Sequence, residues 1–465
     1  MRPEPAPRFF IRTYGCQMNV YDSGRIADLL GGQGWRAADS PEDADLVILN
    51  TCHIREKAAE KVYSELGRLA LLRAPRSRRP WLAVAGCVAQ AEGREIMRRA
   101  PQVDLVIGPQ AYHRLPELLD GLRNGAARAG RVALDFPPES KFDRLPEEMM
   151  PRGASAYLTV QEGCDRLCTF CVVPYTRGAE FSRPPEEVVA EARRLLDGGA
   201  VELVLLGQNV NAYGARDGRG ESWDLARLLA AIHDLAPCRR LRYTTSHPLA
   251  LSDSLIAAHR DLPKLAPFLH LPVQSGADSV LAAMNRRHTA RQYRERIEKL
   301  RAARSDIALS SDFIVGFPGE TDDNFADTLK LVRDIDFAHA YAFKFSARPG
   351  TPAAEMPNQV PEEKKAERLA ELQGLLAEQQ LAFNQKSVGG VQEILLVGRG
   401  RHEGQLKGRG PWMQSVVIDG GVDGDGDGDG DGDGDDNLGR IVRARIQSAG
   451  PHGLHASLET GFDAR

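Results

Sequence analysis

The sequence predicts an α/β protein built from three consecutive parts: a doubly wound α/β domain, a partial parallel (β/α)6 barrel and a small all-β barrel. Two observations carry this prediction. Short apolar, β-rich segments alternate with amphipathic helical patterns as far as residue 382, which is typical of parallel sheets. Beyond that point the alternation stops, and short β-type runs separated by glycines take its place.

Length and composition limit the kinds of protein that this chain can be. A chain of 465 residues is long enough for two or three domains, and 42% hydrophobic with 27% charged residues is an ordinary globular composition. No apolar run reaches the length of a membrane span, and residues 1–10 lack the apolar centre of a secretory signal. We therefore expect a cytoplasmic protein that does not contact a membrane.

Residues 8–125 form the first predicted domain. Its strands are expected at 8–14, 46–50, 81–85 and 105–107, and its helices at 21–30, 55–72 and 91–99. Cys16, Cys52 and Cys87 each follow a predicted strand by a few residues. Ligands of doubly wound sheets gather outside the carboxyl ends of the strands, so we expect these thiols to converge on one edge. The helix starts that follow them would help to keep a thiolate ionised. The alternative is three unrelated buried thiols.

Residues 126–149 are rich in proline and charge, and we interpret them as a linker. The second predicted domain covers residues 150–382. Its six strands are expected at 156–160, 201–206, 241–245, 268–273, 307–315 and 340–345, with helices at 184–196, 223–235, 252–259, 290–304 and 322–335 between them. Strand–helix repeats of this length favour a parallel barrel, or part of one.

Three cysteines, Cys164, Cys168 and Cys171, lie on the loop after the first strand of this barrel. They are too few for a closed zinc site, and they suit a cubane iron–sulfur cluster with one iron left open. A zinc site completed by Cys238 or His247, or a redox-active cysteine pair, are the alternatives. The chain has seven cysteines, six of them in two groups of three, which favours metal ligation in a reducing compartment over disulfides.

Polar residues occur at the ends of the other barrel strands, as expected for a mouth that binds a ligand. They are Gln208, Asn209, Ser246, His247, Gln274, Ser275, Ser346 and Arg348, with Asp312 inside the fifth strand. Each one alone could instead cap a helix or bond the backbone.

Residues 385–461 are predicted to form the small β-barrel, after an amphipathic helix at 361–384. Basic residues are frequent early in it, at Arg399, Arg401, Lys407 and Arg409, and small β-barrels of this class often bind RNA. A Gly-Asp repeat at 423–436 interrupts it. The spacing of its aspartates is that of a calcium-binding loop, but no helices flank the repeat in the sequence. We therefore interpret the repeat as an expansion of a loop. Its eight aspartates turn an otherwise mildly basic chain into one of net charge −4.

The segment 164–171, Cys-Asp-Arg-Leu-Cys-Thr-Phe-Cys, resembles the CxxxCxxC signature of radical S-adenosylmethionine (SAM) enzymes. The resemblance implies that this triad holds a [4Fe–4S] cluster whose open iron binds SAM. Gly178-Ala179-Glu180 resembles the family's segment for the amino group of SAM. The expected SAM contacts are therefore Phe170, Gly178, Glu180, Gln208, Ser246, Gln274 and Asp312.

The whole chain resembles the radical SAM methylthiotransferases, which join an N-terminal cluster domain, a radical SAM core and a C-terminal TRAM barrel. The segments that carry this resemblance are 13–19 (TYGCQMN), 50–52 (NTC), 207–211 (GQNVN), 244–248 (TTSHP), 271–276 (LPVQSG) and 285–289 (NRRHT). They are most similar to the branch of the family that acts on N6-isopentenyladenosine 37 of tRNA. The assignment implies that Cys16, Cys52 and Cys87 hold a second [4Fe–4S] cluster, which carries the inserted sulfur.

The implied reaction places a methylthio group on C2 of that adenosine, in the tRNA anticodon stem-loop. This carbon bears an unactivated C–H bond, so a radical supplied by a cofactor is needed. We expect a monomer that receives electrons from a donor such as flavodoxin or ferredoxin. The alternatives are a sister enzyme acting on threonylcarbamoyl-adenosine in tRNA or on a ribosomal-protein aspartate, and a non-catalytic RNA-binding iron–sulfur protein.

Overall fold

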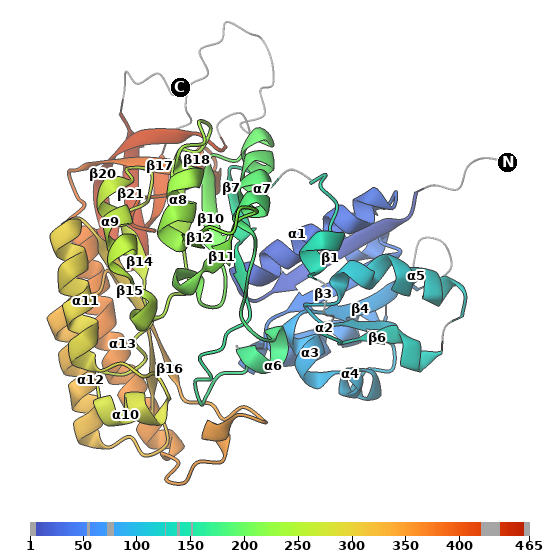
Figure 1. The fold of residues 1–465 in the computed structure, drawn as a ribbon, viewed down its shortest axis with the longest axis horizontal. Helices are drawn as coiled ribbons and strands as arrows, with labels where there is room; N and C mark the ends of the chain where they lie inside the picture. Colours follow the sequence, from blue (N-terminus) through green and yellow to red (C-terminus); the bar gives the residue numbers. More distant parts are fainter. Residues whose placement is uncertain are drawn as a thin grey trace, which may run out of the picture. The chain divides into compact units, whose positions relative to one another are not determined.

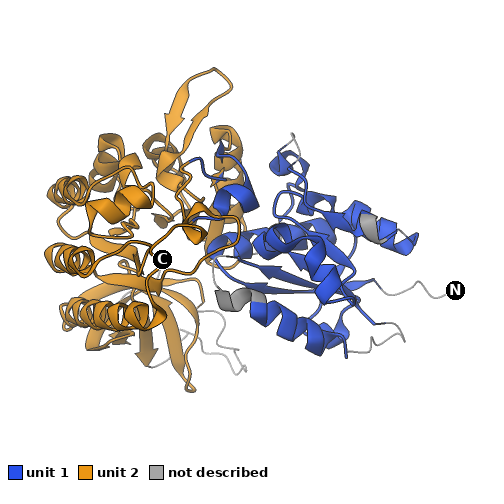
Figure 2. Ribbon diagram, turned by 90° about the horizontal axis from the view of Figure 1, so that it is seen from below, with its two compact units in different colours: residues 1–151, 162–165, 171–181 blue, residues 152–161, 166–170, 182–465 orange. Residues whose placement is uncertain are grey.

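The computed structural model describes residues 6–53, 56–71, 79–125, 127–136, 140–149, 152–419 and 438–459. The Gly-Asp repeat 423–436 lies outside these residues. The chain divides into two compact units (Figure 2). The first comprises Met1–Pro151, Glu162–Asp165 and Cys171–Phe181, and the second comprises Arg152–Gln161, Arg166–Phe170 and Ser182–Arg465.

The first unit contains a six-stranded parallel sheet with helices on both faces (Figure 1). In spatial order its strands are β2 (Arg36–Ala37), β1 (Arg8–Tyr14), β3 (Leu46–Thr51), β4 (Trp81–Ala85), β5 (Leu105–Ile107) and β6 (Val132–Ala133). Its helices are α1 (Gln17–Gly32), α2 (Glu56–Leu69), α3 (Cys87–Glu92), α4 (Arg94–Arg99) and α5 (Leu115–Arg123). Alternate residues of β3 enter two different cores, Ile48 beneath α1 and α5 and Val47 beneath α2 and α4. The predicted doubly wound domain is therefore confirmed.

Two details of this unit differ from the expectation. The helix expected at 91–99 is broken into α3 and α4 at Gly93, whose φ of +55° is left-handed. The interval 126–149 is more than a connection, because it supplies strand β6 and the buried side chain of Lys141. A two-residue edge strand among prolines and charges gives almost no periodic signal.

The second unit contains the partial barrel. One sheet has the order β13 (Arg240–Tyr243), β10 (Glu202–Leu206), β7 (Ser155–Thr159), and another has the order β14 (Phe268–His270), β15 (Ala308–Val315), β16 (His339–Lys344). All strands within each sheet are parallel, and the parallel bridge of Leu241 with Leu265 continues β13 toward β14. The predicted six-stranded parallel arrangement is thus confirmed, in sequential order.

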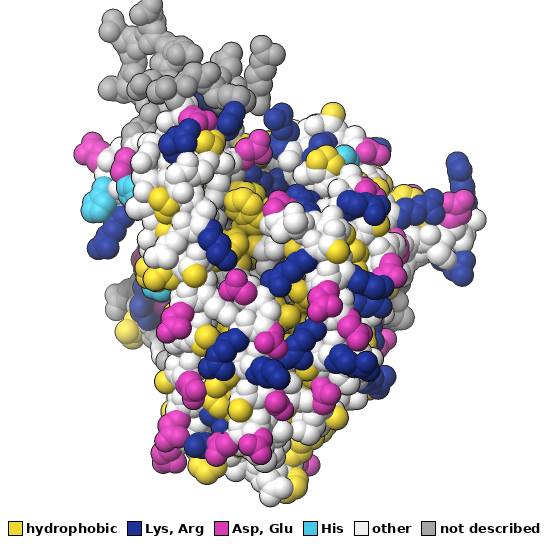
Figure 3. All heavy atoms as spheres, turned by 90° about the vertical axis from the view of Figure 1, so that its left-hand side faces the viewer, with side chains coloured by type: hydrophobic (Ala, Val, Ile, Leu, Met, Phe, Trp, Pro, Cys, Tyr) yellow, Lys and Arg dark blue, Asp and Glu magenta, His cyan; other side chains and the backbone are white. Residues whose placement is uncertain are grey.

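Helices α7 (Pro185–Asp197), α8 (Leu225–His233), α9 (Asp253–Asp261), α11 (Ala290–Ala303) and α12 (Asp322–Ile335) connect these strands. Thr289 and Thr321 begin α11 and α12 with complete capping boxes. Elements that we did not expect are the helices α6 (Val173–Arg177) and α10 (Asp278–Ala283), the hairpin β11 (Gly214–Arg216) with β12 (Ser222–Asp224), and the short pair β8 (Gln161–Glu162) with β9 (Phe181–Ser182). Over α11 and α12, basic and acidic side chains are interspersed (Figure 3).

Helix α13 (Glu362–Gln385) packs on β15 and β16 and leads into a closed five-stranded barrel. The barrel strands are β17 (Val391–Arg399), β18 (Gln405–Arg409), β19 (Ser415–Asp419), β21 (Gly453–Leu458) and β20 (Ile441–Gly450) in spatial order. A core that includes Ile394, Val416 and Ile446 fills it. The predicted TRAM-like barrel is confirmed. The sequence did not predict β18, because its residues QLKGR offer a single large apolar side chain.

Charged side chains join this small barrel to the larger one. The fully buried carboxylate of Glu202 on β10 accepts a hydrogen bond from Arg242 at 2.8 Å and pairs with Arg409 of β18. Arg242 also donates to the carbonyl oxygens of Gly410 and Pro411, each at 2.9 Å. Within the described part of the chain, no helix combines the length and apolar character that crossing a membrane requires.

Candidate cluster sites

The three N-terminal cysteines lie at the carboxyl ends of adjacent strands. Cys16 follows β1 and precedes the first turn of α1, Cys52 follows β3, and Cys87 begins α3 after β4. Because β1, β3 and β4 are neighbours in the sheet, the structure brings these residues to one edge. The thiol of Cys52 hydrogen-bonds to the sulfur of Cys16, and Cys87 lies within electrostatic range of Cys16.

Two glycines allow the cysteine loops to lie this close together. A Cβ atom on Gly15 would lie 2.4 Å from the Cβ of Cys52, and one on Gly86 would lie 2.4 Å from the side-chain oxygen of Asn50. Both glycines have positive φ angles, +142° and +87°. Any side chain at these positions would push the cysteine loops apart, so close contact between strand ends is built into the backbone.

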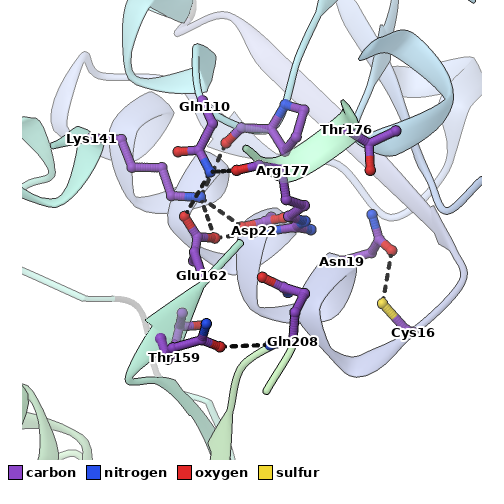
Figure 4. Close-up of polar contacts among 12 residues, drawn as sticks. Cys16, Asn19, Asp22, Gln110, Lys141, Thr159, Glu162, Thr176, Arg177 and Gln208 are labelled. Carbon is purple, nitrogen blue, oxygen red and sulfur yellow. Dashed lines mark hydrogen bonds and ion pairs between the residues drawn. The ribbon is translucent and has the colours of Figure 1, made fainter. Parts of the chain in front are cut away.

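Two buried asparagines hold the same edge together. The thiol of Cys16 donates to the side-chain oxygen of Asn19 at 3.2 Å, as Figure 4 shows. The amide of Asn19 donates in turn to the side chain of Asn50 at 3.1 Å, and Asn50 donates back to the backbone oxygen of Asn19 at 2.9 Å. These bonds fix the start of α1 against β3.

The surroundings of Cys16 favour its thiolate. The hydrogen bond from Cys52 is the largest influence, and it outweighs burial to lower the pKa of Cys16 to about 6. The positive charge of Arg177 and the backbone N–H groups of Met18 and Asn19 act in the same direction. The pKa of Cys87 is raised because that thiol is buried, although a hydrogen bond with Arg177 opposes the effect.

Arg177 belongs to a buried group of four charges in the first unit. Its guanidinium donates to Asp22 at 2.6 Å and to Glu162 at 2.9 Å. Lys141 donates to the same oxygen of Glu162 at 2.7 Å (Figure 4). Gln110 donates to the other oxygen of Glu162 at 3.0 Å. Burial acts against the ionised form of Glu162, but Lys141 and Arg177 keep its pKa below the usual value.

This charged group ties helix α6 to helix α1 within the first unit. Arg177 lies on α6, shortly after Cys171, and Asp22 lies on α1, shortly after Cys16. We did not predict these charged residues, because they are scattered over more than 150 positions. The only available signal was the unusual Thr-Arg-Gly-Ala-Glu segment that follows the triad.

The second cysteine set, Cys164, Cys168 and Cys171, occupies the loop between β8 and α6. Cys164 donates its backbone N–H to Gly178 at 3.3 Å. In the second unit, Thr169 anchors the loop by bonding to the backbone of Met284, Ala283 and Ala353. Leu167 turns the chain with a φ of +50°. The loop is therefore bonded before its turn to the first unit and after its turn to the second.

Arg286 contacts the second set directly, and we did not predict it as a site residue. Its guanidinium donates to the sulfur of Cys168 at 3.6 Å and to the carbonyl of Pro272 at 2.5 Å. The rings of His247 and His288 lie edge to face, with their centroids 5.6 Å apart. Burial, with Arg286 nearby, lowers the pKa of His247 to about 2 and that of His288 to about 4. Both imidazoles are therefore neutral near pH 7.

Several buried polar atoms in this region have no hydrogen-bond partner among the described residues. They are the hydroxyl oxygen of Ser246, the Nε2 atoms of His247 and His288, and the Nε atom of Arg286. Unpaired buried polar atoms are costly, and they are expected where a polar ligand completes a site. Within the second unit these atoms therefore fit a polar ligand beside Cys168.

In the second unit, backbone hydrogen bonds fix the position of several residues that we expected to contact SAM. Gln208 donates its backbone N–H to the side chain of Gln161 at 2.9 Å. Gln274, with a φ of +80°, donates its N–H to the backbone oxygen of Asp312 at 3.0 Å, so these two residues are brought together. The carboxylate of Asp312 faces His270 at 3.4 Å. The ring of Phe170 packs on Phe317 with centroids 6.5 Å apart.

The other expected SAM contacts, Gly178 and Glu180, belong to the first unit. Gly178 ends α6 with a φ of +85°, and Glu180 donates its backbone N–H to the side chain of Asp165 at 3.0 Å. Among the residues that the structure describes, no three Cys, His, Asp or Glu side chains are arranged to hold a single metal ion.

Comparison with protein-family models gives two matches. Residues 8–108 match uncharacterized protein family UPF0004, and residues 158–332 match the radical SAM superfamily. The first match covers the sheet that carries Cys16, Cys52 and Cys87, and the second covers the loop of Cys164, Cys168 and Cys171.

Solved structures with a similar fold include TsrM from Kitasatospora setae, a radical SAM methyltransferase with cobalamin and a [4Fe–4S] cluster bound. It has a TM-score of 0.57 at 13% identity, over 75% of this chain and 77% of that chain. OxsB, a cobalamin-dependent SAM radical enzyme, has a TM-score of 0.51 at 13% identity, over 80% of this chain and 56% of that chain. At these identities the likeness shows the fold alone.

Proposed function

We propose that this chain, a radical SAM enzyme of methylthiotransferase type by its UPF0004 and radical SAM domains, methylthiolates C2 of N6-isopentenyladenosine 37 in tRNA. The cofactors would be SAM and two [4Fe–4S] clusters. The protein would act in the cytoplasm as a monomer, with flavodoxin or ferredoxin as electron donor. Insertion of sulfur at an unactivated C–H bond requires both a radical and a sulfur carrier.

The observation that carries this proposal is the presence of two separate cysteine triads in one chain. Cys16, Cys52 and Cys87 converge at the edge of one sheet, and Cys164, Cys168 and Cys171 share one loop. A cluster on the second triad would supply the electron that cleaves SAM to a 5′-deoxyadenosyl radical, and a cluster on the first would carry the sulfur.

Side chains near the two cysteine triads support both proposed cluster sites. In the first unit Arg177 supplies a buried positive charge beside Cys16 and Cys87, which favours thiolates as ligands. In the second unit the guanidinium of Arg286 donates a hydrogen bond to the sulfur of Cys168 at 3.6 Å. The neutral imidazoles of His247 and His288 offer buried hydrogen-bonding atoms to a polar ligand.

The small C-terminal barrel supports an RNA substrate. Arg399 and Lys407 lie on β17 and β18, and Lys407 is exposed to solvent. The ion pair of Arg409 with Glu202 joins this barrel to the larger one, so RNA bound to it would be held by the same compact unit. Neutralisation of phosphates by such cations dominates RNA affinity and makes it dependent on salt.

The test is nucleoside analysis by mass spectrometry of isopentenylated tRNA incubated anaerobically with the reconstituted protein, SAM and a reductant. We expect 2-methylthio-N6-isopentenyladenosine from the wild type, and none from the Cys16→Ala variant, which should still release 5′-deoxyadenosine. Methylthiolation of threonylcarbamoyl-adenosine or of a ribosomal-protein aspartate instead would replace the proposed substrate.

A further inference from the structure

One face of the β14–β15–β16 sheet carries a row of aromatic rings that are partly exposed to solvent. His339, Tyr341 and Phe343 alternate along β16 and pair in register with Ser310, Asp312 and Ile314 of β15. The residues between them on β15, Phe313 and Val315, are fully buried on the opposite face. The aromatic row therefore faces away from the helices that cover the sheet.

The rings form a continuous ladder. Phe268 of β14 meets His339 edge to face at 6.3 Å, and His339 meets Tyr341 at 4.8 Å. Tyr341 and Phe343 are nearly parallel, at 25°, with centroids 6.5 Å apart. Tyr341 is 51% exposed and Phe343 48% exposed, although each stands in a regular strand. Large apolar side chains exposed side by side commonly mark a binding surface.

A polar group accompanies the ladder on the same face. His270 of β14 contacts the hydroxyl of Ser310 at 3.0 Å through Nδ1, and the carboxylate of Asp312 at 3.4 Å through Nε2. These contacts orient Asp312 beside Tyr341, its partner in the strand register. Aromatic rings and an oriented hydrogen-bond acceptor can together recognise a planar base. The rings stack on the base, and the acceptor receives a hydrogen bond from an N–H group of the base.

One hydrophobic cluster of the second unit links this face to residues 166–170 of the cysteine loop. Ile314 follows Asp312 on this side of β15. Both Ile314 and Phe170 pack against the same buried cluster, which includes Phe317. Phe170 lies between Cys168 and Cys171 in the sequence. β16 pairs only with β15 among the described strands, so the ladder lies at an edge of the sheet.

From this geometry we propose that the ladder of Tyr341 and Phe343, with Asp312, binds the extruded purine base of the RNA substrate. This inference rests on the proposed function. Extrusion of a base from a loop is the usual way in which an enzyme reaches a base atom for chemistry, and an aromatic stack compensates for the lost stacking in the RNA. The exposed edge position favours a base on a large molecule over the small cofactor.

The test compares two anticodon stem-loop RNAs, one with N6-isopentenyladenosine at position 37 and one with an abasic site there. Affinities are measured by fluorescence anisotropy with the cluster-loaded protein. The wild type should bind the intact loop about tenfold more tightly, because base–aromatic stacking has roughly this effect on affinity. The Tyr341→Ala/Phe343→Ala variant should lose that preference and bind the abasic loop as the wild type does, which also shows that it is folded.

Two further variants serve as controls. Tyr341→Phe/Phe343→Tyr keeps both rings and should keep the preference. Trp223→Ala removes an aromatic side chain from the β12 hairpin strand and should leave the preference unchanged. Retention of the preference by the double alanine variant would overturn the inference while leaving the proposed function standing. A tenfold loss of SAM affinity in that variant, measured by equilibrium dialysis, would assign the ladder to the adenine of SAM and also overturn it. Failure of the wild type to bind either RNA would instead contradict the proposed function.

Discussion

The guanidinium of Arg286 donates a hydrogen bond to the sulfur of Cys168 across 3.6 Å, in a region where both side chains are buried. A buried cation next to a ligand sulfur stabilises the more negative, reduced form of a cluster. With the proposed cluster bound to Cys168, Arg286 would make that cluster easier to reduce.

We predict that Arg286→Leu lowers the midpoint potential of the cluster held by Cys164, Cys168 and Cys171. The measurement is a redox titration followed by electron paramagnetic resonance, in a background in which Cys16, Cys52 and Cys87 are alanine. Arg287→Leu is the matched control, because Arg287 is exposed and bonds to Asn285. An unchanged potential in Arg286→Leu would show that the contact with Cys168 has no electronic role.

A second prediction concerns the buried charges around Arg177. Lys141→Met should destabilise the first unit by about 3–5 kcal/mol, because it leaves carboxylates buried without one of their cations. Arg123→Met removes an exposed cation paired with Asp120, and it should cost less than about 1 kcal/mol. Chemical denaturation monitored by circular dichroism compares the two, and equal losses of stability would contradict the prediction.

A third prediction concerns pH and the metal-free protein. The pKa of Cys16 is about 6, so its thiolate fraction rises as the pH increases through 6 and falls below it. Alkylation of Cys16 by iodoacetamide should reach half its maximal rate near pH 6. Cys52→Ala removes the hydrogen bond that lowers this pKa most, and it should move the midpoint to higher pH.

Peptide mass spectrometry measures this alkylation site by site, with Cys238 as an internal reference. Burial raises the pKa of Cys238 to about 11, so this thiol should stay unmodified over the same pH range. A midpoint for Cys16 near that of an ordinary thiol would show that Cys52 and Arg177 do not act on it.

A fourth prediction tests the close approach of the cysteine loops. Gly15→Ala would place a Cβ 2.4 Å from the Cβ of Cys52, so the loops must separate and iron binding by the N-terminal set should fall. Gly31→Ala is the control, because a Cβ there meets nothing within 4 Å and the residue lies in α1. That change should stabilise the protein by about 0.4–1 kcal/mol. Normal iron content in Gly15→Ala would refute the role of this contact.

The parts of the fold that were predicted correctly are those with strong periodic patterns. Strands such as β4 carry continuous apolar runs between turns, and the order of parallel strands then placed Cys16, Cys52 and Cys87 on one edge. What the sequence did not predict depends on contacts between distant residues. Lys141 looks like a linker residue until the fold places it against Glu162, and Arg286 gains its meaning only from its contact with Cys168.

The aromatic ladder illustrates the same limit. Tyr341 and Phe343 alternate as in any strand with one buried face, and they would be assigned to a core from the sequence alone. Only the structure shows that the opposite face of the sheet is the buried one, and that Tyr341 and Phe343 are exposed beside Asp312.

The central claim is that each cysteine triad holds its own cluster, and anaerobic iron and sulfide analysis of the reconstituted protein tests it most directly. Wild type should contain about eight irons per chain, falling to about four when Cys164, Cys168 and Cys171 are replaced by alanine. About four irons in the wild type, falling to none in the variant, would contradict the claim. It would mean that Cys16, Cys52 and Cys87 are ordinary thiols and that the methylthio assignment must be withdrawn.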